Sequence, residues 1–375
     1  MTTTASGKSF GKRVLHLFVW VAIALVACEI FYRFAWTEPP KTELIADNHP
    51  VFHHVPPAFL KGGLGEYDFR GAKYGEKKKP GAVRVVFMGD SFTYGFTASD
   101  QTIPAHFKRL AITEFPDRSI EVLNFGYKSY APLLHAVVYR RLVKQLDADY
   151  VLMLYDTFDS QEDSLYARLA TFDQNGDPVA VVGEHFQNTG LKHSALVRFL
   201  LFATEVVRNH WGYLPYELRI ANRLTYLSNP DRFAAQVNYS FQTVERLADK
   251  ITEDGSRFVL YHYPPVFMLR DTHEFAGYFA TIWGLYAPWQ APGKSPFGQK
   301  LLAFCAETEL DCHDFTPEVL TMEEELGAGG SRLAIYNNED AHFTGDANAR
   351  FARFILDTLK EEGFPHPAKT AEPAP

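Results

Sequence analysis

The tripeptide Gly89-Asp90-Ser91 places a serine directly after a short apolar run, Val83 to Met88. A serine hydroxyl is a poor nucleophile until a neighbouring base takes its proton and a third group orients that base. Near the other end of the chain, Asp340 and His342 are separated by one residue. On a loop, this spacing lets the carboxylate contact one imidazole nitrogen while the other nitrogen faces a serine. We therefore predict a catalytic triad of Ser91, His342 and Asp340.

Other groups of residues offer alternative sites. Asp311 and His313 form a second Asp-x-His word, but within a predicted strand. The pair His53-His54 resembles metal ligands, yet no carboxylate or cysteine cluster accompanies it, so a turn is favoured and no metal is predicted. We expect His262, at the end of a strand, to be a hydrogen-bonded core residue. The stretch 326–331 is glycine-rich but lacks the lysine of a phosphate loop, and the words HExxH and GxSxG are absent.

The elements that position these residues alternate between strand and helix. Apolar, β-branched runs predict strands at 83–88, 119–125, 150–155, 257–263 and 310–315, and helices are predicted at 103–115, 132–145, 240–253, through Cys305, and at 346–362. Such alternation predicts a parallel sheet within a domain spanning 81–362. Ser91 then lies at the carboxyl edge of the sheet, where open parallel sheets place their active sites.

Three segments depart from this alternation. Residues 37–80 are rich in Pro, Gly, His and Lys and predict an irregular lead-in. Residues 161–241 predict an insertion or lid that contains a helix at 196–211. Residues 363–375 predict a disordered tail, while 315–346 is predicted to be a loop.

The segment 14–36 is apolar enough and long enough to cross a membrane. Glu29 and Arg33 lie four residues apart and are expected to pair on one helix face. Because the basic residues precede the span, residues 1–13 are predicted to be cytoplasmic and the rest of the chain extracytoplasmic, or periplasmic. An alternative interpretation takes Cys28 as the lipidated first residue of a lipoprotein. Both interpretations predict a membrane-tethered domain.

Composition restricts the class of protein. The chain has 375 residues, 46% of them hydrophobic, and a net charge of −8. These values fit a globular protein and argue against nucleic acid as a partner. Its three cysteines are too few for a disulfide scaffold. Cys305 and Cys312 are expected either to form one disulfide or to remain buried thiols, and their spacing does not decide between these states.

Four blocks of the sequence resemble the SGNH, or GDSL-type, hydrolase superfamily, and in particular its membrane-anchored bacterial members. The blocks are VVFMGDSFTYGF around Ser91, VLNFGYKSYA around Asn124, YVLMLYDTFD ending at Asp159, and EDAHFTGDANARFA around His342. The resemblance implies a flavodoxin-like three-layer α/β/α sandwich. It also implies that Ser91 is the nucleophile, that His342 is the base and that Asp340 orients it, with no cofactor.

The residues expected to bind the oxyanion or substrate depart from the family pattern. The family's oxyanion glycine falls on Ser129, with Gly126 nearby, and the family's asparagine, immediately before Asp159, falls on Phe158. Loss of one side-chain oxyanion donor costs about 3 to 4 kcal/mol, or roughly 100- to 1000-fold in rate. Thr157 would supply a replacement donor if the loop register shifts by one residue.

These observations predict a serine esterase or O-acyltransferase that acts on acyl esters, with acetyl favoured, of a cell-envelope carbohydrate. The alternative is a catalytically silent module of the same fold that binds glycan or scaffolds an envelope assembly. Phe158 and the aromatic-rich insertion motivate that alternative. The sequence does not distinguish hydrolysis from acyl transfer.

Overall fold

A computed structural model describes residues 6–35, 77–127, 130–167, 170–181, 194, 196–197, 229–266, 269, 295–327, 329–337 and 341–366. The chain divides into two compact units. One comprises Met1–Asn48 and Glu184–Tyr216, and the other comprises His49–Gly183 and Glu217–Pro375.

The first unit contains the helix α1 (Ser6–Ala35), whose window Val14–Phe31 is apolar and exposed along its length. By length and composition this helix is compatible with a membrane span or a signal anchor. The predicted pair between Arg33 and Glu29 is present at 2.9 Å. Glu29 also accepts hydrogen bonds from the Ser194 hydroxyl at 2.6 Å and from the N–H of Leu196 at 2.9 Å, both within this unit.

The second unit is built on a five-stranded parallel sheet with the order β2-β1-β3-β6-β7. The strands are β1 (Val83–Gly89), β2 (Ile120–Gly126), β3 (Tyr150–Asp156), β6 (Arg257–Tyr263) and β7 (Cys312–Asp314). Every residue of β1 and β3 is buried, as their predominantly apolar sequences require. The strand order is that of flavodoxin-like folds, which confirms the predicted fold class.

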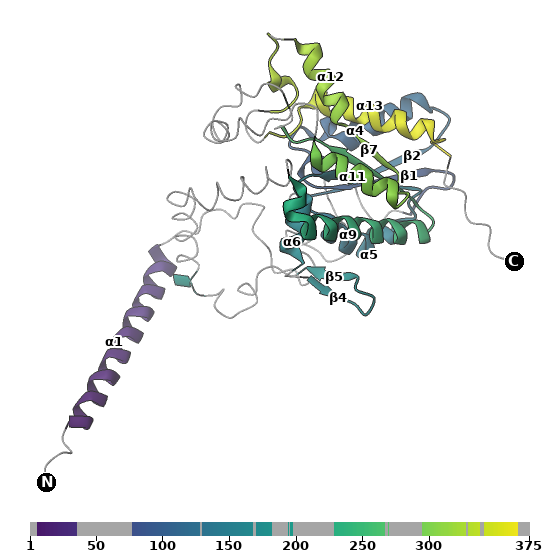
Figure 1. Cartoon of the computed structure of the whole chain (residues 1–375). Helices are drawn as coiled ribbons and strands as arrows, with labels where there is room; N and C mark the ends of the chain where they lie inside the picture. The colour runs from purple at the N-terminus through teal and green to yellow at the C-terminus, as the bar shows by residue number, and fades with distance from the viewer. Residues whose placement is uncertain are drawn as a thin grey trace. The chain divides into compact units, whose positions relative to one another are not determined.

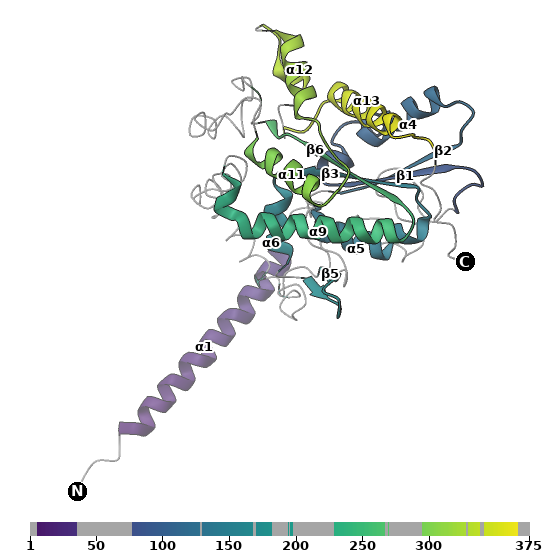
Figure 2. The ribbon, with the colours of Figure 1, turned by 45° about the vertical axis from the view of Figure 1, so that its right-hand side comes forward.

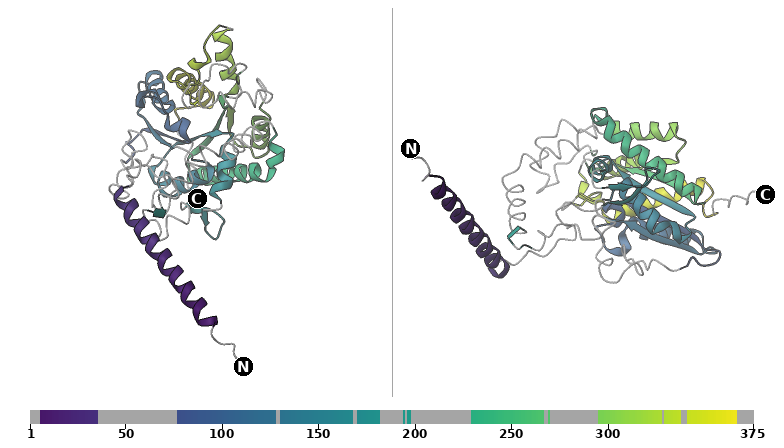
Figure 3. Two further views of the ribbon diagram at one scale, coloured as in Figure 1. Left: turned by 90° about the vertical axis from the view of Figure 1, so that its left-hand side faces the viewer. Right: turned by 90° about the horizontal axis from the view of Figure 1, so that it is seen from below.

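Helices cover both faces of this sheet and produce three layers (Figures 1 and 2). Successive strand residues point to opposite faces, so that Phe87 packs edge-on against Phe107 of α4 while Val86 and Met88 join the core on the other side. The left view of Figure 3 shows the sheet between the two helical layers. One layer contains α4 (Ile103–Glu114) and α13 (Gly345–Glu361), and the other contains α5 (Pro132–Arg141), α9 (Ala234–Glu253) and α11 (Pro296–Glu307).

The segment predicted as an insertion, 161–241, is only partly described. It holds most of α6 (Asp159–Tyr166), and α9 begins within it. Between these helices the strands β4 (Ala170–Phe172) and β5 (Pro178–Val181) form an antiparallel hairpin, which the sequence analysis did not predict. Of the helix predicted at 196–211, residues 198–211 lie outside the described residues.

The prediction of a loop over 315–346 was wrong at its start, because α12 (Thr316–Leu326) occupies that position. The periodic pattern of apolar residues that would predict α12 is weak. A buried polar contact holds this helix in place. Glu323 is 2% exposed and lies 3.4 Å from the guanidinium of Arg332. This contact joins residues nine apart, so helical periodicity in the sequence does not reveal it. The short helices are α3 (Ser91–Tyr94), η1 (Ser99–Gln101), η2 (Val143–Leu146), η5 (Pro230–Phe233) and η8 (Arg332–Ala334).

Cys305 and Cys312 form a disulfide with a Cα–Cα distance of 6.2 Å. This bond joins the last turn of α11 to the first residue of β7. The structure thereby decides between the two states that the sequence left open.

Candidate functional site

Ser91 lies at the point where β1 ends and α3 begins. Asp90 caps α3, because its Oδ1 accepts a 2.9 Å hydrogen bond from the backbone N–H of Phe92. Asp90 itself is buried, whereas Ser91 is half-buried and therefore reaches the surface at the carboxyl edge of the sheet. As the first residue of α3, Ser91 also has a backbone N–H that the helix does not use.

Ser91 and His342 are brought together from opposite ends of the domain. The Nε2 atom of His342 lies 2.7 Å from the Oγ atom of Ser91. The imidazole is held between the rings of Phe92 and Phe96, with centroid distances of 4.6 and 4.4 Å. These contacts fix the ring in an orientation from which Nε2 can accept the serine proton.

The backbone before α13 fixes the position of His342. The backbone carbonyl of His342 accepts a 2.8 Å hydrogen bond from the N–H of Asn337, and Tyr336 and Phe343 form an isolated β-bridge. Ala341 has a φ of +57°, a left-handed conformation that non-glycine residues rarely adopt. Two predicted site residues, Asp340 and Ser129, lie outside the described residues, so their roles remain predictions.

Buried acidic groups surround the base of α3. The hydroxyl of Tyr263 donates a 2.7 Å hydrogen bond to Oδ1 of Asp90. Burial raises the pKa of Asp90, although the hydrogen bonds from Tyr263 and Phe92 and the charge of His342 oppose this shift. Burial, followed by the charges of Asp90 and Asp156, raises the pKa of Asp159 well above its ordinary value. Asp159 is directed inward, where its Oδ2 accepts from the N–H of Asp156 at 2.9 Å.

Gly126 and Asn124 support α3 from the neighbouring strand. The amide of Asn124 donates to the carbonyl of Thr93 at 2.9 Å, and its Oδ1 accepts from the N–H of Gly126 at 2.8 Å. The N–H of Gly126, a predicted oxyanion donor, is therefore used within β2. Gly126 instead provides space, because a Cβ at this position would lie 2.5 Å from Cβ of Thr93 and from the backbone nitrogen of Tyr94.

A second hydrogen-bonded chain ends at Thr157 on the same edge of the sheet. His262 and Asp314 are paired in register on β6 and β7, and Nδ1 of His262 lies 3.0 Å from Oδ1 of Asp314. Nε2 of His262 lies 3.5 Å from Oγ1 of Thr157. Burial tends to raise the pKa of Asp314, but hydrogen bonds from His262 and Thr316 and the charge of His262 outweigh it and hold this pKa below its usual value.

The position of the proton on His262 follows from the ionised state of Asp314. A carboxylate only accepts hydrogen bonds, so Nδ1 of His262 must carry a proton. The other ring nitrogen, Nε2, faces the hydroxyl of Thr157. The expectation that His262 is a hydrogen-bonded core residue is confirmed, since it is 1% exposed. Asp314 was not predicted from the sequence, although its position at the end of the next strand was the available signal.

The alternative sites do not converge on Ser91 within the described residues. Asp311 and His313 contact each other and Glu362. The pair His53-His54 lies outside the described residues. Of the glycine-rich stretch 326–331, Gly327 serves as the C-cap of α12.

No protein-family model and no curated protein matches this chain. Several solved structures are similar in fold. A two-domain esterase active on acetylated mannans shares 12% identity with a TM-score of 0.40, and the match covers 78% of this chain and 52% of that one. An acetyl-xylooligosaccharide esterase from Geobacillus Stearmophilus shares 12% identity with a TM-score of 0.41, over 76% and 97% of the two chains. A protein assigned to the G-D-S-L lipolytic family from Desulfitobacterium hafniense DCB-2 shares 11% identity with a TM-score of 0.37, over 74% and 99%.

These matched structures are two esterases and a protein of the G-D-S-L lipolytic family. The chain spans about half the length of the two-domain esterase. At these identities and TM-scores the similarity does not extend to activity or substrate, so the chemistry must be derived from the side chains of this chain.

Proposed function

We propose that this protein is a serine esterase or O-acyltransferase that acts on acyl esters, with acetyl favoured, of a cell-envelope carbohydrate. The observation that supports the proposal is the 2.7 Å contact between Oγ of Ser91 and Nε2 of His342. Ser91 directly follows β1, and the strand order reverses between β1 and β3. Ligands of open α/β sheets bind at this kind of switch point.

The geometry supports a two-step reaction. Ser91 Oγ attacks the acyl carbonyl carbon while its proton moves to His342 Nε2, and Asp340 stabilises the resulting imidazolium. The tetrahedral intermediate then collapses, and the imidazolium returns the proton to the leaving alcohol. Water or a sugar hydroxyl next gives its proton to His342 and attacks the acyl-serine. The imidazolium then returns this proton to Oγ of Ser91 as the second tetrahedral intermediate collapses, which releases the acid or the new ester.

The oxyanion is assigned to backbone donors. The N–H of Ser91 begins α3 and is not used by that helix. The N–H of Ser129 is the second donor. With Phe158 in the place of the family's asparagine, we expect a rate below that of a site with the full donor set, by up to about 100- to 1000-fold.

We also propose that α1 anchors the domain on the outer side of the cytoplasmic membrane. The basic residues before the span and the disulfide between Cys305 and Cys312 support this orientation. Disulfides persist in oxidising compartments. A lipid on Cys28 would place the domain in the same compartment.

Labelling with a fluorophosphonate tests the assigned nucleophile. The full chain in detergent should label at Ser91, and the Ser91→Ala and His342→Ala variants should lose labelling. Ser99→Ala, at an exposed serine of η1, is the matched control and should label like the unmodified chain. Equal labelling of Ser91→Ala would reject Ser91 as the nucleophile.

The silent glycan-binding module is the second candidate function. Two observations favour it, namely Phe158 in the donor position and the use of the Gly126 N–H within β2. A folded chain that binds acetylated oligosaccharides but neither labels nor cleaves p-nitrophenyl acetate would support this candidate. For an active chain, addition of an unacetylated oligosaccharide distinguishes transfer from hydrolysis through the appearance of an acetylated sugar.

A further inference from the structure

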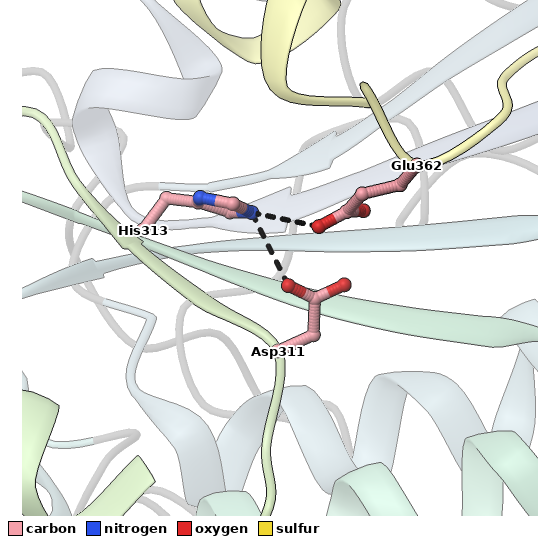
Figure 4. A group of neighbouring side chains, drawn as sticks. All are labelled: Asp311, His313 and Glu362. Atoms are coloured by element: carbon pink, nitrogen blue, oxygen red, sulfur yellow. Dashed lines mark ion pairs between the residues drawn. The ribbon is translucent and has the colours of Figure 1, made fainter. Parts of the chain in front are cut away.

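Three ionisable side chains converge at the end of the sheet opposite Ser91. Asp311 immediately precedes β7, His313 lies within β7, and Glu362 immediately follows α13. Figure 4 shows the imidazole of His313 directed toward both carboxyl groups. This cluster lies where the parallel strands begin, whereas Ser91 lies where they end, so the two sites are separate.

The two distances from His313 to the carboxyl groups are close to those between ligands that share one cation. Nε2 of His313 lies 3.2 Å from Oδ1 of Asp311 and 3.4 Å from Oε1 of Glu362. One ligand atom from each of the three residues lies within 4.8 Å of the others. Tetrahedral Zn²⁺ at about 2.0–2.1 Å from nitrogen and oxygen ligands holds those ligands about 3.3–3.4 Å apart.

The Nε2 atom of His313 also lacks an alternative partner. It is shielded from solvent and makes no hydrogen bond of acceptable geometry to a described residue, despite its closeness to both oxygens. A buried polar nitrogen without a hydrogen bond is costly. A cation between the two oxygens would satisfy it through the lone pair.

Surrounding groups orient the three side chains. The guanidinium of Arg257, at the start of β6, donates to Oδ2 of Asp311 at 2.7 Å and to Oε2 of Glu362, which leaves Oδ1 and Oε1 for a ligand. The ring of His313 stacks on Tyr261 with a centroid distance of 5.1 Å. Outer contacts of this kind fix the ligands of metal sites.

The charge of the cluster favours a divalent cation. Two carboxylates contribute two negative charges, and Arg257 compensates one of them. One negative charge therefore remains to be balanced. A proton on His313 would also balance it, and the cluster would then be an ion-pair network without a metal.

We propose that Asp311, His313 and Glu362 bind a divalent cation of the Zn²⁺ class, with a fourth position open to water. The mixed nitrogen and oxygen donors fit this class better than Ca²⁺ or Mg²⁺, which take oxygen ligands. The bound cation would tie the end of α13 to β7, beside the disulfide at Cys312. Its role is structural, since the active edge of the sheet lies at the other end of the strands.

Titration of Zn²⁺ into the EDTA-treated full chain in detergent tests this site by calorimetry. We expect binding of Zn²⁺ and a rise in the unfolding temperature. His313→Asn should weaken the affinity of this site by about 100-fold or more, since loss of even an outer contact costs about 10- to 100-fold. Asp311→Asn should weaken it similarly, and it keeps the test decisive if His313→Asn does not fold.

His106→Asn is the matched control, because this half-buried histidine of α4 lies near Asp100 and Asp346 but outside the cluster. It should bind Zn²⁺ like the unmodified chain. The proposal is overturned if no Zn²⁺ binds, if folded His313→Asn binds it with unchanged affinity, or if Ca²⁺ binds the cluster more tightly than Zn²⁺. Absence of binding together with destabilisation of His313→Asn would identify a plain ion-pair network.

Discussion

Substitution of Gly126 by alanine tests whether the packing between β2 and α3 positions Ser91. The new Cβ would lie 2.5 Å from both Thr93 Cβ and Tyr94 N, and 2.7 Å from the Thr93 carbonyl carbon. Ordinary van der Waals contact begins near 3.4 Å. The crowded atoms include the backbone of α3, so a side-chain rotation cannot relieve the clash and α3 must move by about 1 Å.

The magnitude follows from this displacement. A misplacement of about 1 Å in a catalytic group lowers rates by about 100-fold, and here it acts on the 2.7 Å contact between Ser91 and His342. Overpacking costs about 1–3 kcal/mol. The reduced entropy of the unfolded chain returns about 0.4–1 kcal/mol. We therefore expect Gly126→Ala to lose about 1–2 kcal/mol of unfolding free energy and to retain about 1% of the rate.

Two assays measure these effects separately. Fluorophosphonate labelling and p-nitrophenyl acetate hydrolysis report the rate, and urea unfolding reports the stability. Gly329→Ala is the control, because nothing lies within 4 Å of a Cβ at that exposed position. Its rate should be unchanged and its stability should stay within about 0.5 kcal/mol of the unmodified chain. An unchanged rate and stability in Gly126→Ala would refute the claim that this contact positions the nucleophile.

Three further predictions concern groups around the core. Tyr263→Phe removes the hydrogen bond to Asp90 and should cost about 1.5–3 kcal/mol in urea unfolding, so unchanged stability would argue against this bond. Burial raises the pKa of Asp163 to about 8, so this residue holds a proton in the folded state over a range where the unfolded chain has lost it. As the pH rises from about 4 to about 8, Asp163 should therefore lower the unfolding free energy by up to about 1.4 kcal/mol per pH unit. Asp163→Asn should remove that pH dependence, and an unchanged dependence would contradict the raised pKa of Asp163. Cys305→Ser should cost about 2–3 kcal/mol through loss of the disulfide with Cys312, and reduction of the unmodified chain should give the same decrease, while equal stability with and without reductant would contradict the bond.

The strands were predictable because their physical signal is local. The runs that became β1, β3 and β6 are predominantly apolar, as strands buried on both faces require. The helix α12 was not predictable in the same way, because its anchor is the contact of Glu323 with Arg332 beyond the end of the helix. Polar contacts between distant residues leave no periodic pattern in the sequence.

In the candidate site, too, some features could be predicted from the sequence and others could not. The proximity of Ser91 and His342 follows from their positions after the first strand and before the last helix, and the structure places them together. The roles of Asn124 and Tyr263 depend on how neighbouring elements pack, and neither role was derived from the sequence. These two side chains fix α3 from different strands.

The register of the parallel strands also limits which groups can bind the oxyanion. Because His262 lies opposite Asp314, its Nδ1 proton is held by that carboxylate and its Nε2 faces Thr157. The hydroxyl of Thr157 therefore already has a neighbour at 3.5 Å. Thr157 can replace the missing asparagine only if its hydroxyl turns from His262 toward the substrate. Backbone N–H groups need no such change, which is why the proposed mechanism assigns the developing negative charge to the backbone at Ser91 and Ser129.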